Sequence, residues 1–338
     1  MRVLITGGTG AVGQATVERL VRHGWEVRVI GRRAGFEIPG ADYQVCDITN
    51  FVDVRNQMRG FDTVVHLAAV PNPRVSPGPE VFHINAVGTF NVYEAAAEEG
   101  IRKLVQASSI NAFGCFWGNQ DIIPQYLPID EAHPTFTTDV YSFSKNVIED
   151  IGDYYWRRAG ISSVALRLPA VWSKARMESE EARQQRAKTR ALLDELAAQP
   201  EEVRLARLHQ ARAEIVALRR QGIMEYPAAA QGWQPGSFGA DPLNWAYNFD
   251  RLNFWAYVDE KDSAQSIEKG LTADYEGSHA LFINAATNWL GYDAKTLARL
   301  FFPEVTTFTT SLDGAEALVN IGKARRLIGF DPEYTVQQ

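Results

Sequence analysis

A tyrosine and a lysine stand four positions apart in the segment Tyr141-Ser-Phe-Ser-Lys145. On a helix, this spacing puts the phenol and the ammonium on the same face, one turn apart. A free tyrosine has a pKa of about 10, and a nearby ammonium lowers it because it favours the phenolate. The pair can therefore act as a general base for the proton of a carbinol. Upstream of the pair, Ser109 offers a hydroxyl that can donate to the substrate oxygen.

A glycine-rich turn opens the chain, with glycines at positions 7, 8, 10 and 13. It lies between a strand predicted at residues 3–6 and a helix predicted at residues 12–23. There, Gly7 permits the tight bend, Gly10 lets the backbone approach a pyrophosphate, and Gly13 lets the helix pack against the strand. The alternative is a simple glycine-rich loop.

The helix after this turn begins near Ala11 and Val12. Its unpaired N–H groups and the positive end of its dipole suit the phosphates of a dinucleotide. A Tyr-x-x-x-Lys pair alone occurs by chance on many helices. Together with the glycine turn, it predicts an enzyme that moves a hydride between a nicotinamide and a carbinol carbon.

The first 170 residues alternate between predicted strands and predicted helices. We expect strands at residues 3–6, 26–30, 42–45, 63–67, 103–108 and 163–168. This alternation predicts an α/β fold with a Rossmann-type, doubly wound parallel sheet. Ligands bind beyond the carboxyl ends of such strands, and Gly7, Asp47, Ala68 and Ser109 each follow a predicted strand.

Residues 173–222 break the alternation, since they are rich in Arg, Glu, Ala, Gln and Leu. We interpret them as a hairpin of two charged helices that turns at Gln199-Pro200 and ends near Gly222. The interleaved glutamates favour a solvated arm or an oligomer contact over a nucleic-acid patch. Because the hairpin follows the predicted cofactor site, a lid over the substrate cleft is a further possibility.

The remaining residues predict a smaller C-terminal substrate domain. Aromatic residues on irregular backbone at 223–257 can line a pocket for a sugar-like ligand or can simply pack together. A strand is predicted at 280–284 and a helix at 292–302. The expected domains are a dinucleotide-binding domain at 1–172, the hairpin insertion at 173–222, and a mainly substrate-binding domain at 223–338, of which about 255–270 return to the first domain.

Composition excludes several classes of function. A net charge of −7 argues against nucleic acid as the main partner. No apolar run reaches about 18 residues, so no membrane span is expected, and a core strand directly after Met1 leaves no room for a signal peptide. Cys46 and Cys115 indicate no disulfide framework, and the scattered histidines indicate no metal site. A cytoplasmic protein is expected.

The chain resembles the extended short-chain dehydrogenase/reductase family, in its group of sugar-nucleotide epimerases and dehydratases. The resemblance runs from Thr6 to Pro169 and recurs at residues 257–264 and 323–332. Its motifs, in the order of the family, are Thr6-Gly-Gly-Thr-Gly-Ala-Val-Gly13, Asp47-Ile48, Asp62-Thr-Val-Val-His-Leu-Ala-Ala69, Asn85-Ala-Val-Gly-Thr89, Ser108-Ser-Ile-Asn-Ala-Phe-Gly114, Tyr141-Ser-Phe-Ser-Lys145 and Leu166-Arg-Leu-Pro169.

The resemblance implies roles for individual residues. Ser109 corresponds to the catalytic Ser or Thr of the family. Asn85 belongs to a helix motif on the cofactor side, although a structural hydrogen bond is the alternative. A homodimer is implied, paired through the helix after Tyr141 and its neighbour at 86–98. Asp47, with Ile48, is implied to contact the adenine amino group of the cofactor. Leu67, Ala68 and Ala69 are implied to line its pyrophosphate and ribose, and Pro169 is implied to lie near its nicotinamide.

The end of the second predicted strand departs from the pattern of NAD-dependent members of the family. Those members carry an acidic residue there, which binds the ribose 2′-hydroxyl. This chain has Gly31-Arg32-Arg33 instead. Guanidinium groups suit a 2′-phosphate, so NADP is expected in preference to NAD. The alternative is that Arg32 and Arg33 are two solvated loop residues.

Two signatures for nucleotide diphosphate sugars are also missing. Members that bind such substrates carry an Asn where this chain has Ala170 and an Arg where it has Asn253. We therefore expect an oxidoreductase or epimerase acting on a sugar or sugar nucleotide, with Arg176, Arg183 and Arg186 as candidate substrate contacts. The alternatives are a carbonyl reductase or free-sugar dehydrogenase, a catalytically silent NADP-binding regulator, and a structural scaffold.

Overall fold

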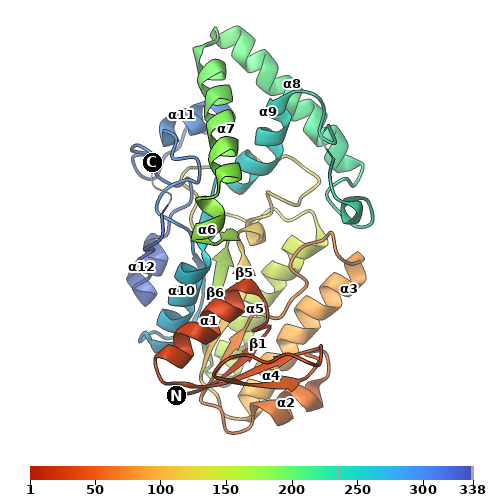
Figure 1. The fold of residues 1–338 in the computed structure, drawn as a ribbon, viewed down its shortest axis with the longest axis vertical. Coiled ribbons are helices and arrows are strands. Elements are labelled where there is room, and N and C mark those ends of the chain that lie inside the picture. Colours follow the sequence, from red (N-terminus) through yellow and green to blue (C-terminus); the bar gives the residue numbers. More distant parts are fainter. Residues whose placement is uncertain (235, 336–338) are drawn as a thin grey trace.

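The computed structural model of the chain describes residues 1–234 and 236–335, and a parallel β-sheet lies in its lower half (Figure 1). The strands of this sheet are β1 (Arg2–Thr6), β2 (Glu26–Gly31), β3 (Ala41–Val45), β4 (Thr63–His66), β5 (Lys103–Ser109), β6 (Ser162–Leu168) and β9 (Ser278–Phe282). The central strands are short apolar runs, such as Val3, Leu4 and Ile5, that are buried on both faces of the sheet.

The order of the strands is β3-β2-β1-β4-β5-β6-β9, and it reverses beside β1. β1 pairs with β2 on one side and with β4 on the other, both in parallel. The remaining pairs of this sheet are parallel too, so all its carboxyl ends open at one edge. The turns after β1 and β4 meet at that edge, where a doubly wound sheet forms a crevice for ligands.

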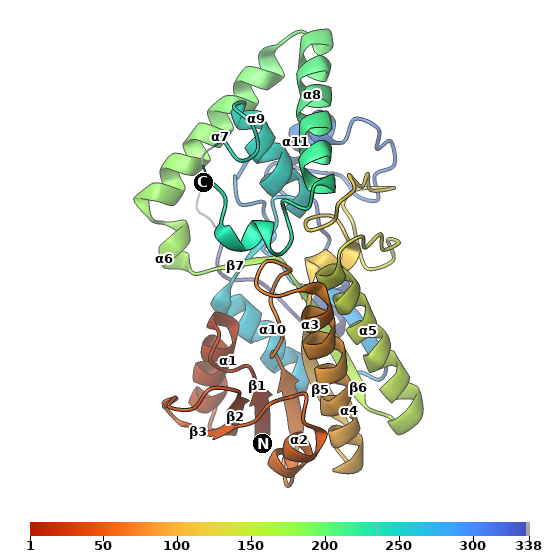
Figure 2. The same cartoon turned by 90° about the vertical axis from the view of Figure 1, so that its right-hand side faces the viewer.

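Helices cover both faces of the sheet (Figure 2). Their bounds are α1 (Ala11–Arg22), α2 (Phe51–Met58), α3 (Gly78–Phe82), a π-turn (His83–Val87), α4 (Gly88–Glu98), α5 (Val140–Ala159), α10 (Glu260–Thr272) and α12 (Gly322–Ile328). α1 packs against α10 on one face, and α12 lies beside α10. On the other face, α4 lies between α2 and α5. The predicted doubly wound architecture is therefore confirmed.

A second region stands on the carboxyl edge of the sheet (Figure 1). Its elements are β7 (Ala170–Trp172), α6 (Lys174–Met177), α7 (Glu180–Ala198), α8 (Glu201–Arg220), α9 (Pro242–Trp245), β8 (Tyr257–Asp259), α11 (Ala294–Phe301) and the short turns Ile110–Phe113, Ala228–Gln231, Ala246–Asp250 and Arg251–Asn253. β7 pairs in parallel with β8. Because α10 begins directly after β8, the chain returns to the sheet at that point.

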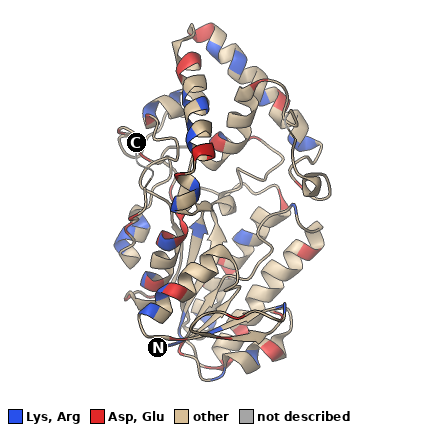
Figure 3. Ribbon diagram, viewed as in Figure 1, with Lys and Arg blue, Asp and Glu red and all other residues tan. Residues whose placement is uncertain are grey.

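α7 and α8 form the hairpin that was predicted within residues 173–222, and it turns at Gln199-Pro200. Gly222 follows the end of α8 with a φ of +82°, a conformation that glycine adopts without strain. Positions of basic and acidic residues are interspersed along both helices (Figure 3). The sequence did not predict α6, a single turn that begins where the Ser173 hydroxyl caps its N-terminus.

Two predicted elements have different ends in the structure. The strand predicted at 280–284 is β9, which ends at Phe282 because the chain then leaves the sheet toward β8. The helix predicted at 292–302 is α11, which begins at Ala294 because the Asp293 carboxylate caps it. Within the described residues, no helix is both long and apolar enough to cross a membrane.

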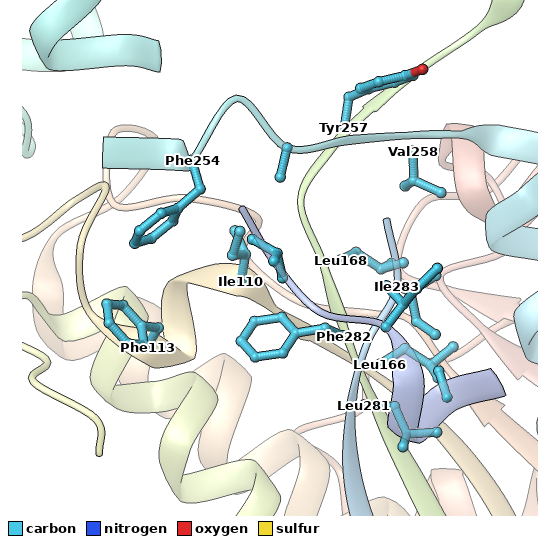
Figure 4. Packing of buried hydrophobic residues seen from close by; sticks show 14 of the residues in the cluster. Ile110, Phe113, Leu166, Leu168, Phe254, Tyr257, Val258, Leu281, Phe282 and Ile283 are labelled. Carbon is cyan, nitrogen blue, oxygen red and sulfur yellow. The ribbon is translucent and has the colours of Figure 1, made fainter. Parts of the chain in front are cut away.

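One hydrophobic core joins the sheet to the region above it (Figure 4). Leu166 and Leu281 belong to adjacent strands of the sheet, and the rings of Phe113 and Phe254 meet edge to face above them, with centres 5.6 Å apart. These residues are all buried. The second region is therefore packed onto the edge of the sheet where the candidate site lies.

Arg219, near the end of α8, is only 2% exposed and binds segments that lie far from it in the sequence. Its guanidinium donates hydrogen bonds of 2.8 Å each to the carbonyl oxygens of Phe116 and Gly118 and to Oδ1 of Asn248. In the described parts of the chain, no carboxylate lies within ion-pair distance of this guanidinium. Burial lowers the pKa of Arg219 to about 10. Carbonyl and amide oxygens thus hold the buried guanidinium.

Candidate active site

Three residues predicted to act together do line one cavity, of about 410 Å³. Ser109 is the last residue of β5, whereas Tyr141 and Lys145 come from the first turns of α5. That helix begins at Val140 because the Asp139 carboxylate accepts a 2.8 Å hydrogen bond from the N–H of Ser142. We call this space the catalytic cavity.

Burial dominates the electrostatics of the Tyr141 and Lys145 pair. Burial raises the pKa of Tyr141 to about 12, although a hydrogen bond with the Ser109 hydroxyl opposes this shift. Burial lowers the pKa of Lys145 to about 8, and the nearby Glu149 carboxylate opposes that shift. The expected fall in the pKa of the phenol is therefore not found in this structure, because burial raises this pKa and the Lys145 ammonium is not among the groups that lower it. At neutral pH the phenol carries its proton.

Ser109 is oriented by a residue that the sequence reasoning missed. The Ser109 hydroxyl oxygen accepts hydrogen bonds from the backbone N–H of Asn111 (3.1 Å) and from its Nδ2 (3.2 Å). With its oxygen engaged in this way, the hydroxyl is left to donate its hydrogen toward the phenol or a bound oxygen. A serine followed two residues later by asparagine, directly after a strand, is the signal that could have indicated this turn.

The glycines of the turn differ in whether the packing of the protein requires them. A Cβ at Gly7 would lie 2.6 Å from the backbone N of Ala68, and one at Gly13 would lie 2.5 Å from Gly8 Cα, so packing requires both glycines. Gly10 has an ordinary φ of −79°, and a Cβ there would lie 3.7 Å from its nearest neighbour. Packing alone does not require Gly10 to be a glycine, but a residue without a side chain there leaves room for a pyrophosphate to approach the protein backbone. This turn therefore fits a dinucleotide.

The start of α1 adds to this cradle. Gly10 occupies the capping position and has no side chain to bind the first N–H groups of the helix. Ala11 and Val12 belong to that first turn, where backbone N–H groups lack intrahelical partners. Such groups bind anionic oxygens, so both residues lie where a pyrophosphate would be held.

The loop after β4 is pinned beside the glycine turn. The backbone N–H of Leu67 donates to the carbonyl oxygen of Thr6 (3.0 Å), and that of Ala68 donates to the Thr6 hydroxyl oxygen (3.1 Å). The Thr6 hydroxyl also lies 2.7 Å from Nδ1 of the buried His66. Leu67 and Ala69 line the catalytic cavity, as does Pro169 at the end of β6. The structure thus brings the two predicted cofactor segments together.

Asn85 makes structural hydrogen bonds. Its Oδ1 accepts from the N–H of Val70 (2.7 Å), and its Nδ2 donates to the Val70 carbonyl (3.2 Å) and to the Ser144 hydroxyl (3.0 Å). Ser144 precedes Lys145 on α5, so Asn85 ties the loop after β4 to the helix that carries the phenol and the ammonium. These contacts favour the structural interpretation over direct contact with a cofactor.

Arg32 and Arg33 follow β2 and are both exposed. The Arg33 guanidinium lies over the Phe36 ring, 5.2 Å from its centre, and the Tyr43 hydroxyl donates to the Arg33 carbonyl (2.6 Å). Within residues 1–234 and 236–335, neither guanidinium forms an ion pair. Both are therefore available to an anionic ligand at the end of β2.

Asp47 and Ile48 follow β3 and differ in their surroundings. Asp47 is exposed, and its Oδ1 accepts hydrogen bonds from the N–H (2.9 Å) and the hydroxyl (2.8 Å) of Thr49. Ile48 is buried against Gly88, where a Cβ would come within 2.5 Å of Ile48 Cδ1. Asp47 keeps a carboxylate oxygen for a ligand, whereas the Ile48 side chain packs in the core.

A second cavity, of about 520 Å³, adjoins the catalytic cavity, and we call it the outer cavity. Phe116, Ala170 and Asn253 line both cavities. Of the three arginines considered as substrate contacts, Arg176 and Arg186 line the outer cavity. Arg183 is exposed and is not among its lining residues. Sequence reasoning missed the buried Asp250, which also lines this cavity.

No group of three or more His, Cys, Asp or Glu side chains is placed to hold a metal ion in the described residues. The candidate site consists of a phenol, an ammonium and a hydroxyl beside a backbone cradle. Such a set can bind a dinucleotide and can move a proton at a substrate oxygen.

Comparison with curated proteins identifies relatives over about half of the chain. The uronate dehydrogenase of Pseudomonas syringae pv. tomato is 30% identical over 169 residues, which cover 49% of this chain and 58% of that protein. The L-arabinose 1-dehydrogenase (NAD(P)(+)) of Haloferax volcanii is 34% identical over 172 residues, which cover 49% of this chain and 66% of that protein. The matches thus span less than two thirds of either relative.

Solved structures share the fold at low sequence identity. A short-chain dehydrogenase/reductase superfamily protein from Agrobacterium tumefaciens with bound NAD has a TM-score of 0.62 and 19% identity, covering 99% of this chain and 93% of that one. A UDP-glucose 4-epimerase from Thermotoga maritima with UDP-glucose has a TM-score of 0.61 and 16% identity, covering 99% and 94%.

The family comparison covers the glycine cradle, the Ser109, Tyr141 and Lys145 set and most of the hairpin, because the family of NAD-dependent epimerases and dehydratases matches residues 3–213. The chain therefore belongs to the NAD-dependent epimerase/dehydratase family.

Proposed function

We propose that the protein is an NAD(P)-dependent oxidoreductase or epimerase that acts on a hydroxyl or ketone of a sugar or sugar nucleotide. The observation that carries this proposal is the meeting of Ser109, Tyr141 and Lys145 in one cavity, beside the cradle formed by the glycine turn. The names of the relatives support a sugar as substrate, since they include a uronate dehydrogenase and an arabinose dehydrogenase.

In this mechanism, the residues of the chain position the substrate oxygen and move its proton. The Ser109 hydroxyl donates to the substrate oxygen, and its orientation is set by Asn111. Tyr141 Oη takes the hydroxyl proton during oxidation and returns it to the carbonyl oxygen during reduction. Lys145 Nζ stabilises the phenolate electrostatically while its hydrogen bond to the Ala107 carbonyl holds it in place. When bound, the nicotinamide supplies or accepts the hydride.

NADP is the preferred cofactor in this proposal. Arg32 and Arg33 are exposed at the end of β2 and lack ion pairs among the described residues. Two free guanidiniums at this edge of the sheet suit a 2′-phosphate, because Arg binds phosphate in a bidentate manner. The coarser statement, that the cofactor is NAD or NADP, follows from the family.

A second candidate is a dehydrogenase of free sugars, with net turnover of the cofactor. Ala170 and Asn253 line both cavities, in place of the Asn and Arg that grip a diphosphate in the family members resembled. The names of the two curated relatives described above support this candidate. Both candidates use the same proton transfer at Tyr141.

This proposal assigns a role to each of the three expected domains. Residues 1–172 hold the cofactor, the hairpin at 173–222 shapes the substrate side, and residues 223–338 supply most of the substrate site, with about 255–270 returning to the sheet. The position of α6 and α7 on the wall of the outer cavity supports a covering role for the root of the hairpin. Residues 235 and 336–338, within the last domain, lie outside the described residues.

The test is incubation of the purified protein with NADP or NADPH and a panel of free and nucleotide-linked sugars. We expect product with at least one of them. A net absorbance change at the nicotinamide band indicates a dehydrogenase or reductase, and product without net change indicates an epimerase or dehydratase. Tight cofactor binding without any product from the panel would contradict the proposal and favour a silent regulator.

A further inference from the structure

The outer cavity is large enough for a ligand of its own. Its volume of about 520 Å³ and the 410 Å³ of the catalytic cavity each fall in the range that encloses one small molecule. The two cavities share Phe116, Ala170 and Asn253, so a single extended ligand can occupy both. A lone monosaccharide at Tyr141 would leave the outer cavity without a ligand.

Aromatic rings form two walls of the outer cavity. Trp172 and Trp289 meet edge to face with centres 5.8 Å apart, and Trp245 lies against Phe249 with centres 4.1 Å apart. The faces of such rings carry partial negative charge, which attracts the weakly positive C–H groups of a sugar ring. Because the rings pack on one another, the walls hold their shape before a ligand arrives.

Asp250 supplies a buried acceptor on the floor of the outer cavity. It is 8% exposed, and its Oδ1 accepts a 3.0 Å hydrogen bond from Nε1 of Trp289. In the described parts of the chain, its Oδ2 has no hydrogen-bond partner, and no basic side chain pairs with it. Burial raises the pKa of Asp250 to about 7. Because Asp250 lines the outer cavity, a ligand hydroxyl group can donate a hydrogen bond to its Oδ2.

Asn253 provides a second acceptor where the two cavities meet. Its Nδ2 donates to the Ala256 carbonyl (2.9 Å), which leaves Oδ1 without a partner among the described residues. A ligand hydroxyl that passes from one cavity to the other can donate to this oxygen. The acceptors at Asp250 and Asn253 thus mark a path for hydroxyl groups out of the catalytic cavity.

The backbone beside these acceptors is held in an unusual conformation. Phe254 and Trp255 have φ values of +56° and +51°, although neither is a glycine. Both are buried, and the N–H of Trp255 donates to the carbonyl of Asp250 (3.0 Å). Such conformations persist only where the surroundings impose them, and they concentrate at ligand sites. The turn fixes Asp250 and Asn253 relative to each other.

The outer cavity carries at most one net positive charge, because the pKa of Asp250 is raised to about 7 and this carboxyl group is only partly ionised at neutral pH. Its wall carries Arg176 and Arg186, and it carries the carboxyl groups of Glu181 and Asp250. Arg186 also donates to the Met177 carbonyl (3.1 Å). A diphosphate carries about two negative charges, which is more than this wall can neutralise. A neutral ligand with many hydroxyls fits better.

We propose that the outer cavity binds a second sugar ring, so that the substrate is a glycoside whose oxidised ring lies at Tyr141 and whose other ring lies between the aromatic walls. Asp250 and Asn253 accept hydrogen bonds from hydroxyls of the outer ring. This inference rests on the proposed function, because it names the substrate class of the same site. Free monosaccharides and nucleotide diphosphate sugars are the poorer substrates.

The test compares kcat/KM for each monosaccharide of a panel, for the disaccharides that carry the same sugar at one end, and for the UDP-sugars. We expect a disaccharide to exceed its monosaccharide and its UDP-sugar by tenfold or more. Equal or higher kcat/KM for the monosaccharide or the UDP-sugar would overturn the inference.

A variant links this preference to the cavity. Asp250→Asn keeps an oxygen for Trp289 but replaces the free acceptor by a donor, so the ratio of disaccharide to monosaccharide kcat/KM should fall by tenfold or more. Glu180→Gln, on the same stretch as Glu181 but outside the cavity lining, is the matched control and should keep the ratio. A ratio unchanged in Asp250→Asn overturns the assignment.

Binding separates failure of this inference from failure of the proposed function. Trp172, Trp245 and Trp289 line the cavity, so tryptophan fluorescence of the NADP-loaded protein reports its occupancy. Disaccharide binding that Asp250→Asn weakens, without turnover of any substrate, would contradict the proposed function and retain the second-ring site. Turnover of monosaccharides with no fluorescence response to disaccharides would retain the function and overturn the site.

Discussion

Lys145 Nζ lies 5.7 Å from the centre of the Tyr141 ring. The ammonium is turned toward the Ala107 carbonyl, to which it donates a 2.8 Å hydrogen bond. In this arrangement the phenol is surrounded by protein and keeps its proton, with a pKa raised to about 12 by burial. A phenol that holds its proton is ready to donate it to a carbonyl oxygen, so the reductive direction finds the correct protonation state at neutral pH.

Tyr141→Phe should remove most of the turnover, because it deletes the proton that the mechanism moves. General acid–base groups contribute about 10²–10⁴-fold to rate, and we expect a loss in that range. The glycine turn is untouched, so cofactor affinity measured by fluorescence titration should stay within about twofold, a free-energy change of roughly 0.4 kcal/mol. Turnover close to that of the wild type would exclude Tyr141 as the acid and base.

Lys145 links stability to pH. Its pKa is about 8 in the folded protein against 10.5 for the free side chain. Below pH 8, Lys145 is protonated in both the folded and the unfolded protein, so the full free-energy cost of burying its charge is present. Between pH 8 and 10.5 the unfolded state binds more protons, so the free energy of unfolding rises with pH.

Lys145→Met should therefore stabilise the protein at pH 7 and inactivate it. Each pKa unit corresponds to about 1.4 kcal/mol, so the gain in free energy of unfolding is on the order of 3 kcal/mol at pH 7 and shrinks by pH 10. Urea unfolding of both proteins at the two pH values measures it. An equal difference at both pH values would show that the charge of Lys145 is not the cause.

Cofactor choice should depend on Arg32 and Arg33. A hydrogen bond to a charged group contributes about 1.5–3 kcal/mol, so replacing both by Ala should weaken NADP by roughly tenfold or more and leave NAD nearly unchanged. Arg22→Ala removes one such charge from the exposed end of α1, where Arg22 pairs with Glu18, and is the control for each single replacement of Arg32 or Arg33. Equal affinity of the wild type for NADP and NAD would disprove the preference.

An exposed aromatic patch on α4 and α5 predicts a homodimer. Phe90 and Tyr154 are exposed, and both contact the Tyr155 ring, with centres 5.6 Å and 5.0 Å from it. Light scattering at micromolar concentration should give twice the mass of the chain, and Phe90→Arg with Tyr154→Arg should halve it. Val203→Arg on α8 is the matched control at an exposed apolar residue. A monomer mass for the wild type would rule out this assembly.

Arg219→Met should destabilise the protein more than a surface change does. It leaves the Phe116 and Gly118 carbonyls and the Asn248 amide oxygen without their donor, and each buried group left unpaired costs about 1–3 kcal/mol. Arg220→Met, at the exposed next residue, should change the free energy of unfolding by less than about 0.5 kcal/mol. Similar midpoints for the two variants in denaturant would show that the contacts of Arg219 contribute little.

Features that depend on near neighbours in the chain were predictable. The need for glycine at position 13 follows from a strand–turn–helix unit within residues 2–22, and the φ of +74° at Gly7 follows from the tight turn there. The shared face of Tyr141 and Lys145 follows from their spacing. The turn of the hairpin at Pro200 was also predictable, because proline fits the start of a helix and not its interior.

Features that depend on distant contacts were not predictable. Asp250 meets Trp289 across 39 positions, and nothing near either residue in the sequence indicates that they share a cavity. The pKa of Tyr141 was expected to fall and instead rises, because the spacing of residues says nothing about burial. Sequence spacing also does not show which side chains line a cavity. Arg183 was therefore predicted as a substrate contact together with Arg176 and Arg186, although it lies outside the lining of the outer cavity.

The bond from Arg219 to Phe116 also sets an order of events during synthesis. Phe116 lines both cavities, yet the donor that holds its carbonyl stands 103 positions later in the chain. All residues up to the end of β6 therefore emerge from the ribosome before Arg219 is available to hold this wall of the two cavities. Long-range closures of this kind slow folding and leave apolar surface exposed for longer. At that stage of synthesis all the residues of the dinucleotide cradle are present, whereas the wall of the outer cavity still lacks the donor that holds it.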